Sequence, residues 1–180
     1  MTEIEAKVKL ERPHDVEERL RRMARFERTR VTEDVYFAPA HLAPADVDPA
    51  RHVVFRIRTL DGQHQLTTKR RRQVAGVEVN EEIDCPLPDV AAFTRFAAAI
   101  GFTPFVTKRK ESRIYVQGDL ALELNHVIGL GWFLEIELLC AADQALAEAA
   151  AERVAAAFAS LGFGREQFER RLYIDLLRAR

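Results

Sequence analysis

The chain has 180 residues, 48% hydrophobic and 31% charged, a normal composition for a globular domain with a sizeable core. Lys and Arg number 27 and Asp and Glu 28, so the formal net charge is -1 and gives no reason to expect a nucleic acid or an anionic membrane as partner. Two cysteines without metal-binding spacing, and no basic-apolar leader, are typical of a reduced, cytoplasmic protein.

Most of the chain alternates apolar and polar residues with a period of two, which predicts β-strands. The opening stretch MTEIEAKVKL places Glu3, Glu5 and Lys7 on one face and apolar residues on the other. Asp61–Gly62 and Gln117–Asp119 predict hairpin turns. Further strands are predicted at 53–60, 64–70, 77–87, 108–116, 119–127 and 132–139.

Four segments have helical character: 15–26, 89–100, 143–161 and 165–177. We expect Asp15, Asp89 and Asp143 to cap the first three, and Gly101 and Gly162 to stop the second and third.

The connecting segments complete this outline. The stretch 38–51 has three prolines and no periodicity, so it predicts a surface loop. The Ala-rich stretch 141–162 is interrupted by charges and is not expected to span a membrane. No second domain boundary is visible, so residues 1–180 are predicted to form one domain.

Charged residues occur in pairs of one sign along single strands. Arg56 and Arg58 share a face of one predicted strand, and Glu135 and Glu137 share a face of another. An open antiparallel sheet with a solvated face would also explain such alternation. The separation by sign favours a closed barrel instead, whose charged interior is costly unless a ligand and ions complete it.

The two kinds of charge predict the ligand of that interior. Several Arg and Lys side chains suit a chain of phosphates. Paired carboxylates suit Mg²⁺ or Mn²⁺, since these hard cations take oxygen ligands and often bridge to phosphates. The pattern therefore predicts a metal-bound polyphosphate.

Seven short motifs, in chain order, resemble those of the CYTH superfamily, also called triphosphate tunnel metalloenzymes. The ExExK of Glu3 to Lys7 stands at the extreme N-terminus, where that family has it, and the likeness covers nearly the whole chain. The other motifs are DVYF (34–37), RIR (56–58), LTTK (66–69), EID (82–84), GLGWFLEIE (129–137) and YIDLL (173–177).

The resemblance implies an α+β fold, a closed antiparallel β-barrel with helices packed outside. It implies catalytic roles for Lys7, Asn125 and Tyr173, and metal-binding roles for Glu3, Glu5, Glu135 and Glu137. It implies further acidic tunnel positions at Glu82 and Asp84. The triphosphate-binding residues that it implies are Lys7, Arg56, Arg58, Lys69, Lys110 and Arg113.

Two positions depart from the family pattern. Asn125 stands where the family has an aspartate, and an amide cannot act as a base or supply a negative metal ligand. Ser112 stands at the usual arginine, with Arg113 displaced by one residue. Such a displacement moves a side chain to the other face of a strand, unless a bulge restores it. Lys108 and Lys110 share a face, so either could supply the inward charge.

The resemblance leans toward the class IV adenylate cyclase branch, which converts ATP to cyclic AMP and pyrophosphate. An inorganic or thiamine triphosphatase is the alternative, and a non-catalytic polyphosphate- or nucleotide-binding module is a third hypothesis. The expected cofactor is Mg²⁺ or Mn²⁺. The expected partner is ATP, inorganic triphosphate or thiamine triphosphate; neither a membrane nor a nucleic acid is expected, and a homodimer is left open.

Overall fold

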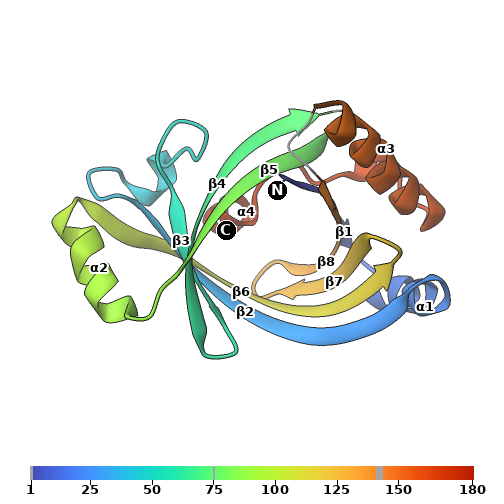
Figure 1. The fold of residues 1–180 in the computed structure, drawn as a ribbon, viewed down its shortest axis with the longest axis horizontal. Helices are drawn as coiled ribbons and strands as arrows, with labels where there is room; N and C mark the ends of the chain where they lie inside the picture. The colour runs from blue at the N-terminus through green and yellow to red at the C-terminus, as the bar shows by residue number, and fades with distance from the viewer. Residues whose placement is uncertain (1, 75, 141–143) are drawn as a thin grey trace. The chain divides into compact units, whose positions relative to one another are not determined.

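The computed structural model describes residues 2–74, 76–140 and 144–180 (Figure 1). Its helices are α1 (Pro13–Met23), α2 (Val90–Ala99), α3 (Gln144–Ser160) and α4 (Tyr173–Arg178), with short 3₁₀ turns at Pro44–Asp46 and Arg165–Gln167. Its strands are β1 (Thr2–Leu10), β2 (Arg25–Pro39), β3 (Phe55–Leu60), β4 (Gln63–Val74), β5 (Val77–Pro86), β6 (Phe102–Gln117), β7 (Leu120–Val127) and β8 (Gly131–Cys140).

The strands form a closed barrel in the order β1-β5-β4-β3-β2-β6-β7-β8. The recorded pairings of β1 with β5 and β8, of β3 with β2 and β4, and of β7 with β8 are all antiparallel. Closure removes the exposed edges of an open sheet and gives every strand an inner and an outer face. The predicted α+β class and closed antiparallel barrel are confirmed.

The chain divides into two compact units, each made of separate segments. Unit 1 comprises Met1–Arg30, Arg70–Glu82 and Glu111–Arg171, and unit 2 comprises Val31–Lys69, Ile83–Lys110 and Leu172–Arg180.

In unit 1, the apolar face of β1 packs beneath α3. Ile4 and Val8 are buried in one cluster with Val154 and Phe158 of α3, and α3 contacts both β1 and β8. Because side chains alternate along a strand, Glu3, Glu5 and Lys7 lie on the opposite face, away from this core.

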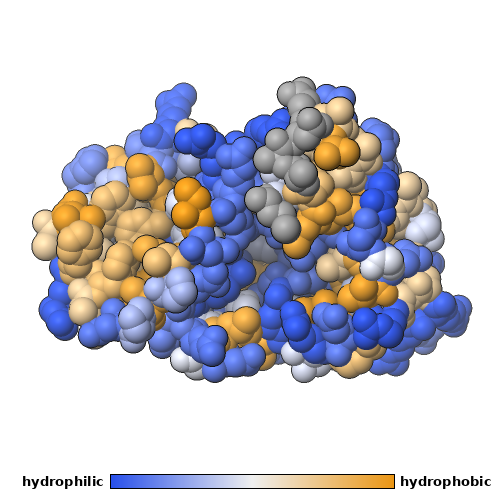
Figure 2. Space-filling view, viewed as in Figure 1, coloured by the Kyte–Doolittle hydropathy of each residue, from blue (hydrophilic) through white to orange (hydrophobic). Residues whose placement is uncertain are grey.

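In unit 2, α2 covers the apolar face of β2 and β3. Phe37, Ile57 and Ala97 are buried together, with Phe55 stacked on Phe37 at a centroid distance of 5.1 Å. By the same alternation, Asp34 of β2 and Arg56 and Arg58 of β3 lie on the face away from α2. Hydrophobic residues also gather on the outer surface over α2, as Figure 2 shows.

The predicted turns and most cap signals are confirmed. Asp61 and Gly62 take φ of 50° and 75°, as a tight hairpin turn requires. The Asp89 carboxylate accepts a hydrogen bond from the Ala92 N–H at 2.8 Å. Gly101 and Gly162, each with φ of 85°, follow the ends of α2 and α3. Asp143 lies outside the described residues.

The predicted bounds of the first helix are wrong, and one long strand lies outside the predicted strands. α1 begins at Pro13 rather than Asp15 and ends at Met23, because proline is well suited to the first helical turn. The fifteen-residue strand β2 was not predicted as one strand, since its first half is mostly exposed and lacks apolar alternation.

The predicted helix at 165–177 is also wrong, because its middle is extended. The Glu169 N–H donates to the Lys7 carbonyl at 2.8 Å, and Phe168 forms a β-bridge with Val8. These contacts with β1 replace helical hydrogen bonds, so only Tyr173–Arg178 forms a helix. Among the described residues, no helix combines the length and apolarity that crossing a membrane requires.

Candidate active site

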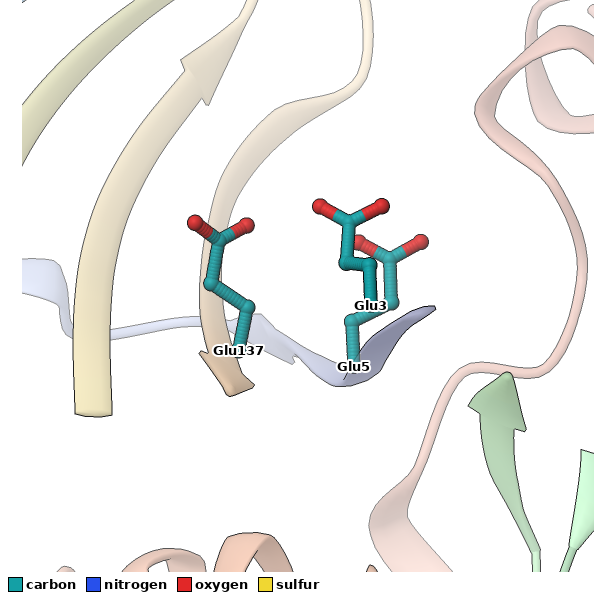
Figure 3. A group of neighbouring side chains, drawn as sticks. All are labelled: Glu3, Glu5 and Glu137. Atoms are coloured by element: carbon teal, nitrogen blue, oxygen red, sulfur yellow. The ribbon is translucent and has the colours of Figure 1, made fainter. Parts of the chain in front are cut away.

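Three carboxylates of unit 1 converge on the inner face of the barrel. Glu3 and Glu5 come from β1 and Glu137 from β8, and Figure 3 shows the three side chains pointing the same way. Their carboxylate oxygens lie within 4.8 Å of one another, and Glu5 is the direct cross-strand partner of Glu137. We call these three residues the acidic triad.

Three carboxylates this close together repel one another when they are ionised. Burial raises the pKa of Glu137 to about 9, and the carboxylates of Glu123 and Glu3 add to the effect. A divalent cation would offset this repulsion and accept the oxygens as ligands. The donor set is entirely oxygen, so the triad fits Mg²⁺ or Mn²⁺.

Two buried asparagines contact the glutamates of this face. Asn80 on β5 donates from Nδ2 to Glu5 Oε1 at 2.9 Å, and Asn125 on β7 donates to Glu135 Oε2 at 2.6 Å. Both asparagines are fully buried. Within the described residues, neither Oδ1 atom has a hydrogen-bond partner, which is unusual for a buried polar atom.

Lys7 lies beside the acidic triad and is paired. Its ammonium donates to Glu78 Oε1 at 3.2 Å, and both side chains are buried. Burial raises the pKa of Glu78, and the nearby Lys7 charge opposes that shift. This pair brings a positive charge beside the acidic triad.

Unit 2 holds a cationic cluster around Asp34, a fully buried residue of β2. Arg58 donates to both Asp34 carboxylate oxygens, at 2.8 and 3.0 Å. Lys108 Nζ lies 2.9 Å and an Arg56 nitrogen 3.5 Å from the same carboxylate. Three cations around one anion leave a net positive charge, which suits a phosphate group.

The cations of this cluster dominate the electrostatics of Asp34. Burial by itself would raise the pKa of that carboxyl, but Lys108, Arg58 and Arg56 together hold it well below its usual range. Two aromatic rings flank Lys108, whose Nζ lies 5.8 Å from the Tyr36 centroid and 5.4 Å from that of Tyr173. Lys108 is therefore held by a carboxylate and two ring faces.

The structure groups several of the predicted residues within each unit. In unit 1, Glu3, Glu5 and Glu137 meet directly, and Lys7, Asn125 and Glu135 share their inner face. In unit 2, Arg56 and Arg58 join Asp34, Lys110 is buried, and Tyr173 lies near Lys108. Lys69 and Glu82 are half-buried, and Asp84 is exposed and accepts from Thr67 at 2.7 Å.

Arg113 lies apart from these groups. It is bound to Glu17 of α1 and lies over the Trp132 ring at 5.5 Å. Tyr115 Oη donates to the same Glu17 at 3.1 Å. Buried Ser112 takes the strand parity of Lys108 and Lys110, so no bulge returns Arg113 to their face. Its role in phosphate binding remains a prediction.

Sequence reasoning left out four buried residues that the site contains. Glu78 and Asn80 share the parity of Glu82 on β5, and Glu123 shares that of Asn125 on β7, so alternation alone could have indicated them. Asp34 was noted only as part of a motif, and nothing in the sequence marks it as the anion that several cations surround.

Comparisons with known proteins find a family match and related sequences. A family model described as the CYTH domain matches residues 1–173. A Methanocaldococcus jannaschii protein named "Putative adenylate cyclase MJ0240" is 30% identical over 138 residues, which are 76% of this chain and 77% of that protein.

Solved structures with this fold include two archaeal proteins. The PH1819 protein of Pyrococcus horikoshii aligns with a TM-score of 0.82 and 25% identity, over 98% of each chain. A conserved hypothetical protein of Pyrococcus furiosus aligns with a TM-score of 0.78 and 28% identity, over 97% of this chain and 99% of that one. The Hippeastrum protein HpAC1 aligns with a TM-score of 0.66 and 18% identity, over 99% and 95%.

Proposed function

The chain belongs to the CYTH domain family, and from this premise we propose that it is a divalent-cation-dependent enzyme that converts a triphosphate substrate. The observation that carries the proposal is the acidic triad, in which one carboxylate oxygen from each of the three half-buried glutamates lies within 4.8 Å of the others. Acidic clusters of this kind bind Mg²⁺ or Mn²⁺ in phosphoryl-transfer sites, where the ion also contacts substrate phosphates.

The proposal gives the two clusters different tasks. Glu3, Glu5 and Glu137 hold the cation, which when bound neutralises charge that develops on phosphate oxygens. Within unit 2, Arg56, Arg58 and Lys108 suit phosphate oxygens, and within unit 1 Lys7 supplies a positive charge beside the acidic triad. The arginines suit this task because their planar groups match phosphate geometry in a bidentate manner.

The first candidate reaction is cyclisation of ATP. The ribose 3′-hydroxyl attacks the α-phosphorus, a new P–O bond forms, and pyrophosphate leaves with the bond electrons while the hydroxyl proton passes to a base or solvent. The support for this candidate is the name of the M. jannaschii relative, which covers 76% of this chain.

The second candidate is hydrolysis, in which water attacks a terminal phosphorus of a triphosphate. The bond from that phosphorus to the bridging oxygen breaks, the diphosphate leaves with the bond electrons, and the water proton passes to a base or solvent. The Hippeastrum protein HpAC1 is described as a "Putative adenylyl cyclase" with a dominant triphosphatase activity. At 18% identity that likeness concerns the fold alone. Both reactions require the triphosphate to be bound in the same way, so only the identity of the products distinguishes them. A binding module without turnover is the third outcome of the same test.

We expect turnover of at least one of ATP, thiamine triphosphate and inorganic triphosphate in the presence of Mg²⁺ or Mn²⁺. All products should be identified by chromatography, because cyclic AMP with pyrophosphate indicates the cyclase and phosphate release indicates the triphosphatase. Excess chelator should abolish either activity. Binding of a triphosphate without any product would indicate a binding module that has no catalytic activity. Turnover that persists in excess chelator would contradict the proposed cation dependence.

Asn125→Asp is expected to raise turnover at limiting Mg²⁺. The new carboxylate would replace the amide that contacts Glu135 at 2.6 Å, and a carboxylate attracts a hard cation more strongly than a neutral amide does. The measurement is a titration of activity against Mg²⁺ for the wild type and the variant. Superimposable curves would mean that position 125 does not influence the cation.

A further inference from the structure

Asn80 has a polar atom that the described protein does not satisfy. Its side chain is fully buried on β5, and its Cα pairs with that of Glu3 across β1. Its Nδ2 donates to Glu5 Oε1 at 2.9 Å, while its Oδ1 has no hydrogen-bond partner among the described residues. A buried acceptor in this condition is normally completed by a water or an ion.

The surroundings of Asn80 restrict what can complete it. The amide is held against Glu5 by its own N–H, and Glu5 belongs to the acidic triad. The Glu5 carboxylate accepts the amide N–H at 2.9 Å, so this contact leaves the amide oxygen without a donor. A cation can satisfy the amide oxygen and the carboxylates together, because Mg²⁺, Mn²⁺ and Ca²⁺ all take carbonyl as well as carboxylate oxygens.

We propose that Asn80 Oδ1 is a neutral ligand of the cation held by Glu3, Glu5 and Glu137. The inference rests on the proposed cation site of the acidic triad and adds a fourth protein oxygen from a third strand, β5. The same amide has two functions: its N–H fixes the Glu5 carboxylate, and its oxygen faces the ion. A neutral ligand adds coordination without further repulsion among the carboxylates.

The test is Mn²⁺ binding measured by calorimetry on the full-length protein without any triphosphate, together with the melting temperature in chelator. Asn80→Leu removes both polar atoms at similar volume. We expect Mn²⁺ affinity to fall about 10-fold or more, while the melting temperature in chelator is unchanged or higher because a buried unsatisfied oxygen is gone.

Asn80→Asp distinguishes two roles of Asn80: a ligand of the cation, or a residue that only positions Glu5. The aspartate keeps an oxygen and adds charge, but it has no N–H for Glu5. If Oδ1 is a ligand, Mn²⁺ should bind more tightly than to the wild type, while repulsion among carboxylates lowers the melting temperature in chelator. If Asn80 acts only through its N–H, Asn80→Asp should bind Mn²⁺ more weakly, which would overturn the proposal.

Thr2→Val is the matched control. Thr2 is buried on β1, on the strand parity opposite to Glu3 and Glu5, and its Oγ1 also has no hydrogen-bond partner among the described residues. Valine should leave Mn²⁺ affinity unchanged and not lower the melting temperature in chelator. Wild-type affinity in Asn80→Leu would overturn the ligand role. If Asn80→Leu does not fold, Asn80→Asp alone tests the proposal, because only tighter Mn²⁺ binding than in the wild type supports a ligand role.

A failure of the proposed function would look different. If the wild-type protein does not bind Mn²⁺ or Mg²⁺ at all, the cation site of the acidic triad is wrong, and the role of Asn80 falls with it. If the wild type binds the ion and both Asn80 variants match it, the site stands and only the inference about Asn80 is wrong.

Discussion

Glu137→Gln is expected to lower metal-dependent turnover of the triphosphate by about 100-fold or more, since even partners that only support metal ligands cost 10–100-fold on removal. Glutamine keeps the size of the side chain but supplies no negative ligand. The melting temperature in chelator should be unchanged or higher, because burial together with Glu123 and Glu3 already raises the pKa of the Glu137 carboxyl to about 9. A neutral amide therefore resembles the state that the metal-free protein holds near neutral pH.

The measurement is turnover against Mg²⁺ concentration, with thermal unfolding in chelator alongside. Glu81→Gln provides the control, since Glu81 is an exposed residue of β5 and should tolerate the change in both assays. Glu5→Gln should behave as Glu137→Gln does, because Glu5 is its cross-strand partner. Near-full turnover in both triad variants would exclude the acidic triad as the cation site.

Asp34→Asn is expected to destabilise the protein by about 3–5 kcal/mol, the usual cost of removing one partner from a buried ion pair. The substitution leaves Arg56, Arg58 and Lys108 around a neutral amide. Inorganic triphosphate should recover part of the loss, because phosphate oxygens can replace the missing charge. The measurement is denaturant unfolding of wild type and variant, with and without triphosphate.

The pH dependence of unfolding gives a second view of Asp34. Its neighbours hold the pKa of the Asp34 carboxyl below the ordinary value of 3.8. The stability that it contributes is therefore fully present above about pH 4 and is lost as pH falls through the folded-state pKa. The difference between the wild type and Asp34→Asn should shrink below pH 4.

The control for Asp34 is Glu33→Gln. Glu33 is the preceding residue on β2, and its side chain is exposed on the opposite face of the strand. We therefore expect the free energy of unfolding of Glu33→Gln to stay within about 0.5 kcal/mol of the wild-type value. Equal stability of Asp34→Asn and Glu33→Gln would mean that Asp34 does not hold the three cations together.

The sequence by itself determined the barrel and which face of each strand is charged. Alternation has a period of exactly two, so the apolar residues Ile4 and Val8 and the charged residues Glu3 and Glu5 are assigned to opposite faces without any knowledge of the partners. The structure confirms the assignment, because the apolar set lies beneath α3. Local signals such as the Asp89 cap were equally readable, since their partners lie within a few residues.

Only the tertiary structure decided which side chains on a face meet. Asp34 gathers Arg58 and Lys108 from two other strands, and Asn80 meets Glu5 across 75 positions of sequence. Such contacts depend on strand order and register, which alternation along one strand does not encode. Arg113 shows the same limit: its parity sends it to the outer face, but only the packing of α1 makes Glu17 its partner.

The C-terminal segment shows where local pattern and tertiary contact compete. Residues 165–177 have helical periodicity, but the Glu169 N–H finds its acceptor on Lys7 of β1. A backbone donor bonded to another strand cannot also bond within a helix. The α-helix of this segment begins only at Tyr173. The Tyr173 ring centroid lies 5.4 Å from Lys108 Nζ, a contact within unit 2.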